Sequence, residues 1–180
     1  GVFPVCPGFG GITLFLKAYE FIKDSRTSNK KDQETFKQII GNSADQMFSF
    51  PEWGPHNRAA KNGLSLTYAA KVFPDHPQAL KWAKMGHLLM DASLKHWSLE
   101  DTEMYCFIWL VDLLIHTDVT GDLSIYESPI MRYYFDYFKN LLCPLGMVPD
   151  YGDSMWLSPW ELSMIFFEKG ATVYRDSHMK

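Results

Sequence analysis

The chain has 180 residues, of which 47% are hydrophobic, and a formal net charge of −4. This length and composition suit one substantial core and exclude a disordered chain. The 17 basic residues are outnumbered by 21 acidic ones and form no concentrated basic face, so we expect no nucleic-acid partner. No apolar run has the length that crosses a bilayer, and we expect no membrane partner.

Three scattered cysteines, Cys6, Cys106 and Cys143, exclude a disulfide framework and a cysteine-based zinc site. No spacing of histidine, cysteine and acidic residues favours a metal ion, and we expect no cofactor. The chain begins with Gly1 and not with Met, which indicates processing or excision from a longer protein.

Apolar residues recur at helical spacing along most of the chain, and almost nothing alternates at the period of a strand. The sequence therefore predicts an all-α fold. In chain order, we expect helices at about 14–23, 33–40, 56–73, 77–95, 103–121, 124–142 and 159–174.

Glycine and proline set several of these bounds. Gly41 and Gly121 each follow an apolar-periodic run, at the position where glycine is favoured past a helix end. Pro55 and Pro77 suit the first turn of a helix, where the missing N–H costs nothing. Pro129 would lie inside the helix at 124–142, so a start near residues 127–128 is equally consistent with the sequence.

A capping pattern precedes the helix at 103–121. Ser98-Leu99-Glu100-Asp101 places a hydroxyl three residues before an acid, which is typical of a capping box. A structural capping role is therefore a strong alternative to any functional role of Asp101.

The segment Trp53-Gly54-Pro55-His56-Asn57-Arg58 opens the long helix at 56–73. A helix start exposes unpaired N–H groups and the positive end of the helix dipole, so it favours a carboxylate or a phosphate. The alternative is a capped helix whose His56 and Asn57 only satisfy the neighbouring backbone.

Short connections between successive long helices predict antiparallel neighbours. The helices at 56–73, 103–121 and 159–174 then run the same way, and their starts share one rim. Polar and aromatic side chains gather there, which favours a functional cleft. The residues of this rim are His56, Asn57, Arg58, Asp101, Glu103, Tyr105, Tyr151, Asp153 and Trp156.

Trp53-Gly-Pro-His-Asn-Arg-Ala59, Phe73-Pro-Asp-His-Pro77 and Glu100-Asp-Thr-Glu-Met-Tyr105 with Ile108-Trp-Leu110 carry a family resemblance. Over about residues 44–175 the chain resembles the helical toroid domain of polysaccharide lyases of the heparinase II/III and alginate-lyase type. The resemblance implies antiparallel helical hairpins that form part of an incomplete (α/α) toroid. Residues 1–180 would be a single helical domain, less regular over 1–43, with the remaining toroid and β-sandwich domains in a parent chain.

The resemblance also implies metal-independent β-elimination of an acidic, uronic-acid-containing polysaccharide by a secreted or periplasmic protein. In that family Asn, His or Arg neutralises the uronate carboxylate, and Tyr or His moves the proton. The matching positions are Asn57, His56 and Arg58 for the first role and Tyr105 or His56 for the second. The expected substrate-binding residues are Trp53, Arg58, Asp101, Glu103, Tyr151, Asp153 and Trp156.

Two other functions fit the pattern. A glycoside hydrolase on a helical barrel would pair Asp101 or Glu103 with Asp153. A non-catalytic scaffold would bind glycan or protein through an aromatic groove. We further expect His87 and His116 to be structural, and apolar surface to be exposed along one edge, because a truncated toroid leaves hairpins without neighbours.

Overall fold

The computed structural model describes residues 12–95, 102–144, 146–149, 151–152 and 160–176. Within these ranges the protein is helical and has no strand, which confirms the all-α class. None of the helices described is long and apolar enough to cross a bilayer. The elements are α1 (Thr13–Ile22), α2 (Lys30–Ser49), α3 (Asn57–Val72), α4 (Ala79–Leu94), α5 (Glu103–Thr120), the 3₁₀ helix η1 (Ser124–Glu127), α6 (Pro129–Leu141) and α7 (Trp160–Tyr174).

The second helix is longer than predicted. Gly41 lies inside α2, so the predicted end at this glycine is wrong, and the expected division after residue 43 falls within the helix. A Cβ on Gly41 would lie 2.8 Å from Nε2 of His76, so the glycine serves a close approach and not a helix end. Burial of Ala44 and Met47 in the core stabilises the helix beyond it.

The hairpin of α3 and α4 is closely packed through small residues. A Cβ on Gly63 would lie 3.1 Å from the carbonyl oxygen of Gly86, and one on Gly86 would lie 2.7 Å from the carbonyl oxygen of Gly63. Pro55 and Pro77, which were predicted to lie in the first turn of these helices, lie just before them. Pro55 precedes the cap of α3, and α4 begins two residues after Pro77, at Ala79.

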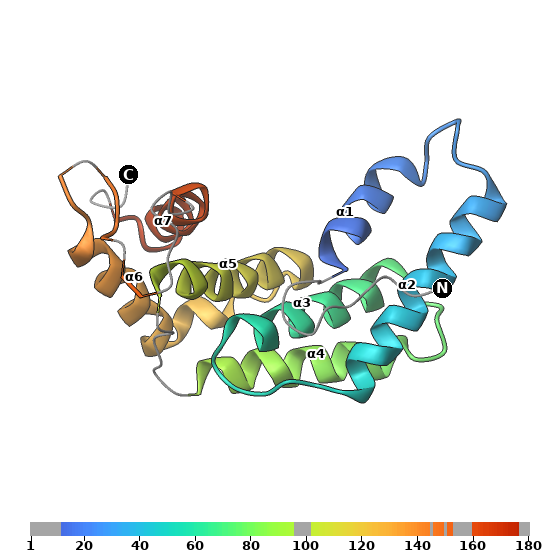
Figure 1. The fold of residues 1–180 in the computed structure, drawn as a ribbon, viewed down its shortest axis with the longest axis horizontal. Coiled ribbons are helices and arrows are strands. Elements are labelled where there is room, and N and C mark those ends of the chain that lie inside the picture. The colour runs from blue at the N-terminus through green and yellow to red at the C-terminus, as the bar shows by residue number, and fades with distance from the viewer. Residues whose placement is uncertain (1–11, 96–101, 145, 150, 153–159, 177–180) are drawn as a thin grey trace.

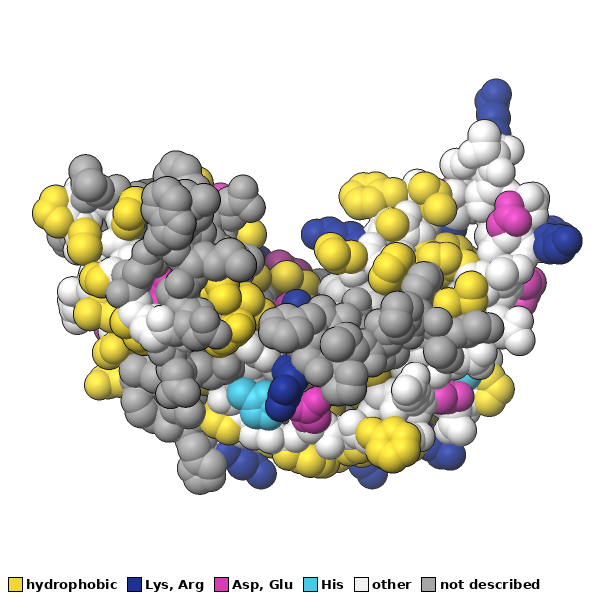
Figure 2. All heavy atoms as spheres, in the orientation of Figure 1, with side chains coloured by type: hydrophobic (Ala, Val, Ile, Leu, Met, Phe, Trp, Pro, Cys, Tyr) yellow, Lys and Arg dark blue, Asp and Glu magenta, His cyan; other side chains and the backbone are white. Residues whose placement is uncertain are grey.

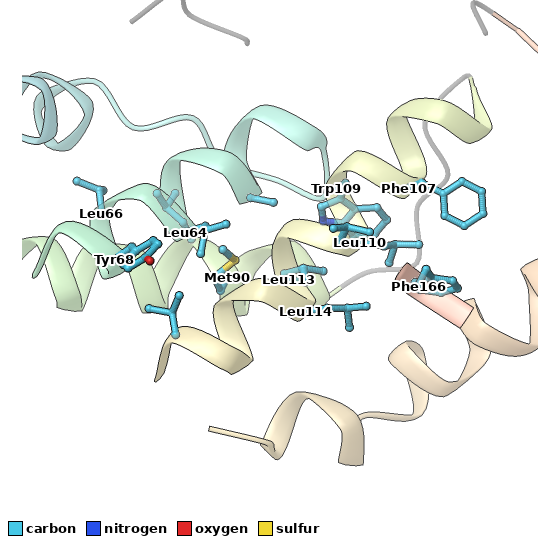
Figure 3. Close-up of a cluster of buried hydrophobic side chains, with 14 of the residues drawn as sticks. Leu64, Leu66, Tyr68, Met90, Phe107, Trp109, Leu110, Leu113, Leu114 and Phe166 are labelled. Carbon is cyan, nitrogen blue, oxygen red and sulfur yellow. The ribbon is translucent and has the colours of Figure 1, made fainter. Parts of the chain in front are cut away.

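The central helix is α5, which is buried on most of its surface. Its side chains pack between those of α3 and α7, as Figure 3 shows for a core that contains Leu64, Trp109, Leu110 and Phe166. The helix ends at Gly121, whose φ of 75° is the left-handed conformation that favours glycine, and this confirms the predicted stop.

The later of the two possible starts for the next helix is the correct one. Residues 124–127 form η1, and Pro129 occupies the first turn of α6. A proline there loses no helical hydrogen bond, whereas a start at Ser124 would have placed it in the interior.

The helices α1, α3 and α5 form a row in which α3 contacts the other two. Lys61 of α3 contacts Asp112 of α5 at 3.0 Å, and Lys71 donates to the carbonyl oxygen of Val119 at 2.6 Å, so the two helices run the same way. The α2 and α4 helices contact each other and α3, and Figure 1 shows α4 below α3 and α2 at the right-hand end of the view.

The direction of α7 differs from the prediction. Figure 1 shows α7 nearly end-on where α3 and α5 lie across the view, so α7 crosses the row and does not continue it. Large rings occupy the crossing. Phe166 stacks on Phe135 of α6 with ring centroids 4.1 Å apart and meets Phe107 of α5 edge-on at 5.5 Å.

Apolar side chains are exposed on both α1 and α7, and not along a single edge as predicted. Figure 2 shows a hollow between the lobe of α6 and α7 and the lobe of α1 and α2, with hydrophobic side chains on both sides. The exposed residues are Leu14, Phe21 and Ile22 on α1 and Met164, Ile165 and Val173 on α7.

Candidate functional site

The start of α3 is fixed by the ring of His56. This residue is the N-cap, and its Nδ1 accepts a hydrogen bond from the backbone N–H of Ala59 at 3.4 Å. Its Nε2 lies 3.1 Å from the carbonyl oxygen of Trp53, a distance at which a protonated Nε2 donates to that oxygen. Both ring nitrogens are thus used by the local backbone. His56 therefore caps α3, which is the structural alternative that the sequence left open.

The turn before His56 is attached to the neighbouring helix. Gly54 has a φ of 116°, which favours glycine, and its carbonyl oxygen accepts from the hydroxyl of Ser93 on α4 at 3.2 Å. The start of α3 is therefore held from two sides, by its own cap and by α4. A rigid start is what a preorganised binding site requires.

Two further predicted residues flank this start. Arg58 pairs with Glu52 at 2.7 Å, and the side chain of Arg58 is half-exposed. An exposed ion pair of this kind contributes little to stability, so the guanidinium can exchange one carboxylate for another. The side chain of Trp53 is also half-exposed.

The start of α5 gathers three predicted residues. Thr102 caps the helix through a hydrogen bond from the N–H of Tyr105 at 3.0 Å. Glu103 is fully buried in the first turn, where the helix dipole favours a carboxylate, and it accepts from the backbone N–H of Tyr151 at 3.2 Å. Burial and the nearby Cys106 raise the pKa of Tyr151 well above its usual range. Tyr151 therefore stays a neutral phenol.

The two helix starts lie at the same end of the row, because α3 and α5 are parallel. Asn57 and Lys61 are four residues apart and share a face of α3, while Tyr105 and Asp112 are seven residues apart and share a face of α5. Since Lys61 contacts Asp112, these faces meet. Asn57 lies one turn and Tyr105 about 10 Å toward the N-terminal side of the contact, so both stand at one end.

The remaining predicted site residues, Asp101, Asp153 and Trp156, lie outside the described residues. A glycoside hydrolase would pair Asp101 or Glu103 with Asp153. Of these three carboxylates, the structure describes Glu103 alone. The capping pattern at 98–101 is outside as well. In the described part of the chain, the cap of α5 is Thr102.

The ion pair of Lys61 and Asp112 was missed by sequence reasoning. Asp112 is the one acid in the apolar run Phe107–Ile115, and this position was a signal that could have been used. A charged residue in such a run must either be paired or change its protonation state.

A second polar cluster lies away from the helix starts. The rings of His87 and His116 meet edge-on with centroids 5.1 Å apart, and they line a pocket together with Asp122. Burial lowers the pKa of His116 to about 4, and its Nε2 is buried without a hydrogen-bond partner among the described residues. The sequence predicts that His87 and His116 are structural; His116 is buried, whereas His87 is exposed.

No group of three or more histidine, cysteine or acidic side chains within the described ranges could hold a metal ion. The predicted site residues that the structure describes are amide, hydroxyl, aromatic and charged side chains at two helix starts. Comparisons of the chain with protein-family models, with curated proteins and with solved structures found no match.

Proposed function

We propose that this chain is the helical part of a polysaccharide lyase that cleaves a uronic-acid-containing glycan by β-elimination. The observation that supports it most is the meeting of the α3 and α5 faces, which puts Asn57 and Tyr105 at one end of two parallel helices. The row of α1, α3 and α5, with α2 and α4 packed against α3, suits part of an incomplete (α/α) toroid. A secreted or periplasmic location belongs to the same proposal.

The first step of the reaction is removal of the proton on C5 of the uronate. That proton is weakly acidic, and its removal builds negative charge on the neighbouring carboxylate. Donors that are positioned beforehand stabilise this charge in the transition state. Asn57 and Arg58, at the start of α3, are assigned this role, and the dipole of α3 adds a favourable field.

Tyr105 is assigned the proton transfer. In its phenolate form it takes the C5 proton, the C4–C5 double bond forms, and the bond from C4 to the glycosidic oxygen breaks. The phenol then returns the proton to that leaving oxygen. His56 is assigned a supporting role, because both of its ring nitrogens are used by the backbone.

The test is the rate at which the ultraviolet absorbance of an unsaturated uronate appears across a panel of acidic polysaccharides. Asn57→Ala is expected to lower turnover by about 100-fold, since one lost transition-state donor costs about 3 kcal/mol. Tyr105→Phe keeps the ring and removes the hydroxyl, and it is expected to abolish most turnover.

Matched controls share the residue type and lie elsewhere. Asn62→Ala changes an amide on another face of α3, and Tyr133→Phe removes a hydroxyl from an exposed ring of α6. Both are expected to retain turnover. Wild-type turnover in the Asn57 and Tyr105 variants would refute the assigned roles.

A further inference from the structure

The ion pair between α3 and α5 is asymmetric in its burial. Nζ of Lys61 lies 3.0 Å from Oδ1 of Asp112, and the side chains are 27% and 4% exposed, respectively. Asp112 is therefore sequestered between the helices, while part of the lysine reaches solvent. Within the described residues, Asp112 is the one carboxylate at ion-pair distance from Lys61.

Asp112 is not fully satisfied by this contact. Its Oδ2 is buried and has no hydrogen-bond partner in the described part of the protein. Burial raises the pKa of Asp112 to about 6, although Lys61 acts to lower it. Taking a carboxylate out of water costs several kcal/mol, and one partner repays this only in part. The pair is thus a poor way to stabilise the contact between α3 and α5, which apolar residues would fill at lower cost.

Lys61 retains capacity to bind a second anion. An ammonium group has three donors, and Asp112 uses one of them. Lys61 also lies one helical turn from Asn57 on the same face of α3, so a ligand held at Asn57 is within reach of a lysine side chain. The buried carboxylate keeps the flexible lysine directed toward the junction of the two helices.

We propose that Lys61, positioned by Asp112, binds a carboxylate of the acidic glycan and makes the site selective for uronates over neutral sugars. The substrate class rests on the proposed function, while the binding role does not require turnover. Asp112 acts through Lys61 and is a positioning residue. In this arrangement Asn57 contacts the sugar at the reacting end, and Lys61 contacts a carboxylate one turn further along α3.

The test is titration calorimetry of the full chain with a uronate tetrasaccharide and with the same tetrasaccharide after reduction of its carboxylates to alcohols. Wild-type protein is expected to bind the acid form more tightly. Lys61→Met removes the ammonium group and keeps an unbranched apolar side chain, and it is expected to weaken binding of the acid form by about tenfold, the value of one charged hydrogen bond. Affinity for the reduced form should stay within about twofold of wild type by the same reasoning.

Lys71→Met is the matched control, because it removes a lysine from the other end of α3. It should leave the ratio of the two affinities unchanged. Asp112→Leu should lower this ratio, and Asp112→Asn, whose amide oxygen can still accept from Lys61, should restore most of it. The double variant Lys61→Met/Asp112→Leu should unfold at or above the wild-type temperature and still lack selectivity.

Two results overturn the inference: wild-type protein that binds the reduced form as tightly as the acid form, or a Lys61→Met variant that keeps full selectivity. Its failure is distinguishable from failure of the proposed function. Selectivity that depends on Lys61 without any unsaturated product would refute the lyase and leave the inference standing. Unsaturated product together with a Lys61→Met variant that keeps full selectivity would support the lyase and refute the inference.

Discussion

At the scale of single residues, the contacts of His56 favour a structural role over a chemical one. The sequence left both roles open, since a histidine at a helix start can cap the helix or face a ligand. Its ring bonds to the N–H of Ala59 and lies at hydrogen-bond distance from the carbonyl oxygen of Trp53, which accounts for both nitrogens. A histidine that caps α3 keeps Asn57 in place without touching the substrate.

Substitution of His56 distinguishes these roles. His56→Ala removes the cap and is expected to lower the free energy of unfolding by about 1 kcal/mol. His56→Asn supplies another capping side chain and should restore both stability and turnover. Chemical denaturation and the cleavage assay on the same preparations provide the measurement. Restored stability without restored turnover would show that the imidazole itself takes part in the reaction.

Asp112 and His116 make opposite contributions to the pH dependence of stability. The pKa of Asp112 is raised from 3.8 to about 6, so the stability it contributes is present below its unfolded value and is lost as the pH rises through 6. The pKa of His116 is lowered from 6.5 to about 4, so its contribution is present above 6.5 and is lost as the pH falls through 4. In the wild type the two partly offset each other.

Removing Asp112 should expose the effect of His116. We expect Asp112→Asn to lose stability more steeply than wild type between about pH 6.5 and 4, measured by denaturant unfolding at a series of pH values. Asp75→Asn changes an exposed acid between α3 and α4 and is the control. Parallel curves for wild type and Asp112→Asn would contradict the raised pKa of the buried carboxyl.

At the scale of elements, the sequence signals that held are those with a single local cause. Gly121 ended α5 because a left-handed residue was needed there, and Pro129 moved the start of α6 because its ring cannot lie in a helix interior. Gly41 misled because glycine also allows close packing, and the side chain of His76, far away in the sequence, uses that space. A long-range contact of this kind leaves no mark in the local sequence.

Close packing of α3 on α4 makes a matched pair of glycine substitutions informative. A Cβ on Gly86 would meet backbone atoms of α3, the carbonyl oxygen of Gly63 at 2.7 Å among them, whereas the three atoms nearest to one on Gly41 belong to the side chain of His76. Gly86→Ala is expected to destabilise by about 1–3 kcal/mol through overpacking. Gly41→Ala should cost much less, since alanine favours a helix by about 1 kcal/mol over glycine. Equal thermal shifts for the two variants would contradict this packing.

At the scale of the whole molecule, the sequence predicted the helical class and the parallel arrangement of α3 and α5. It failed on α7, whose crossing angle depends on how Phe166 packs with rings of α5 and α6. The candidate site was likewise predicted from the sequence only in part. The helix starts were visible as motifs, but the contact of Lys61 with Asp112 joins residues 51 positions apart and needed the fold.

The open shape can be tested in solution. A compact domain of 180 residues has a radius of gyration of about 16 Å. The hollow between the two lobes in Figure 2 predicts a larger value from X-ray scattering of the monomer at low concentration. A radius at or below the compact value would show that α1 and α7 close on each other in solution.

The identity of the reaction product tests the central proposal most directly. Mass spectrometry of the fragments released from a uronic-acid polysaccharide separates elimination from hydrolysis, since an eliminated fragment is lighter by one water and carries a double bond. We expect unsaturated fragments from the wild type and their loss in the Asn57→Ala/Tyr105→Phe double variant. Fragments that are all saturated, or no fragments from any acidic polysaccharide, would contradict a lyase at the starts of α3 and α5.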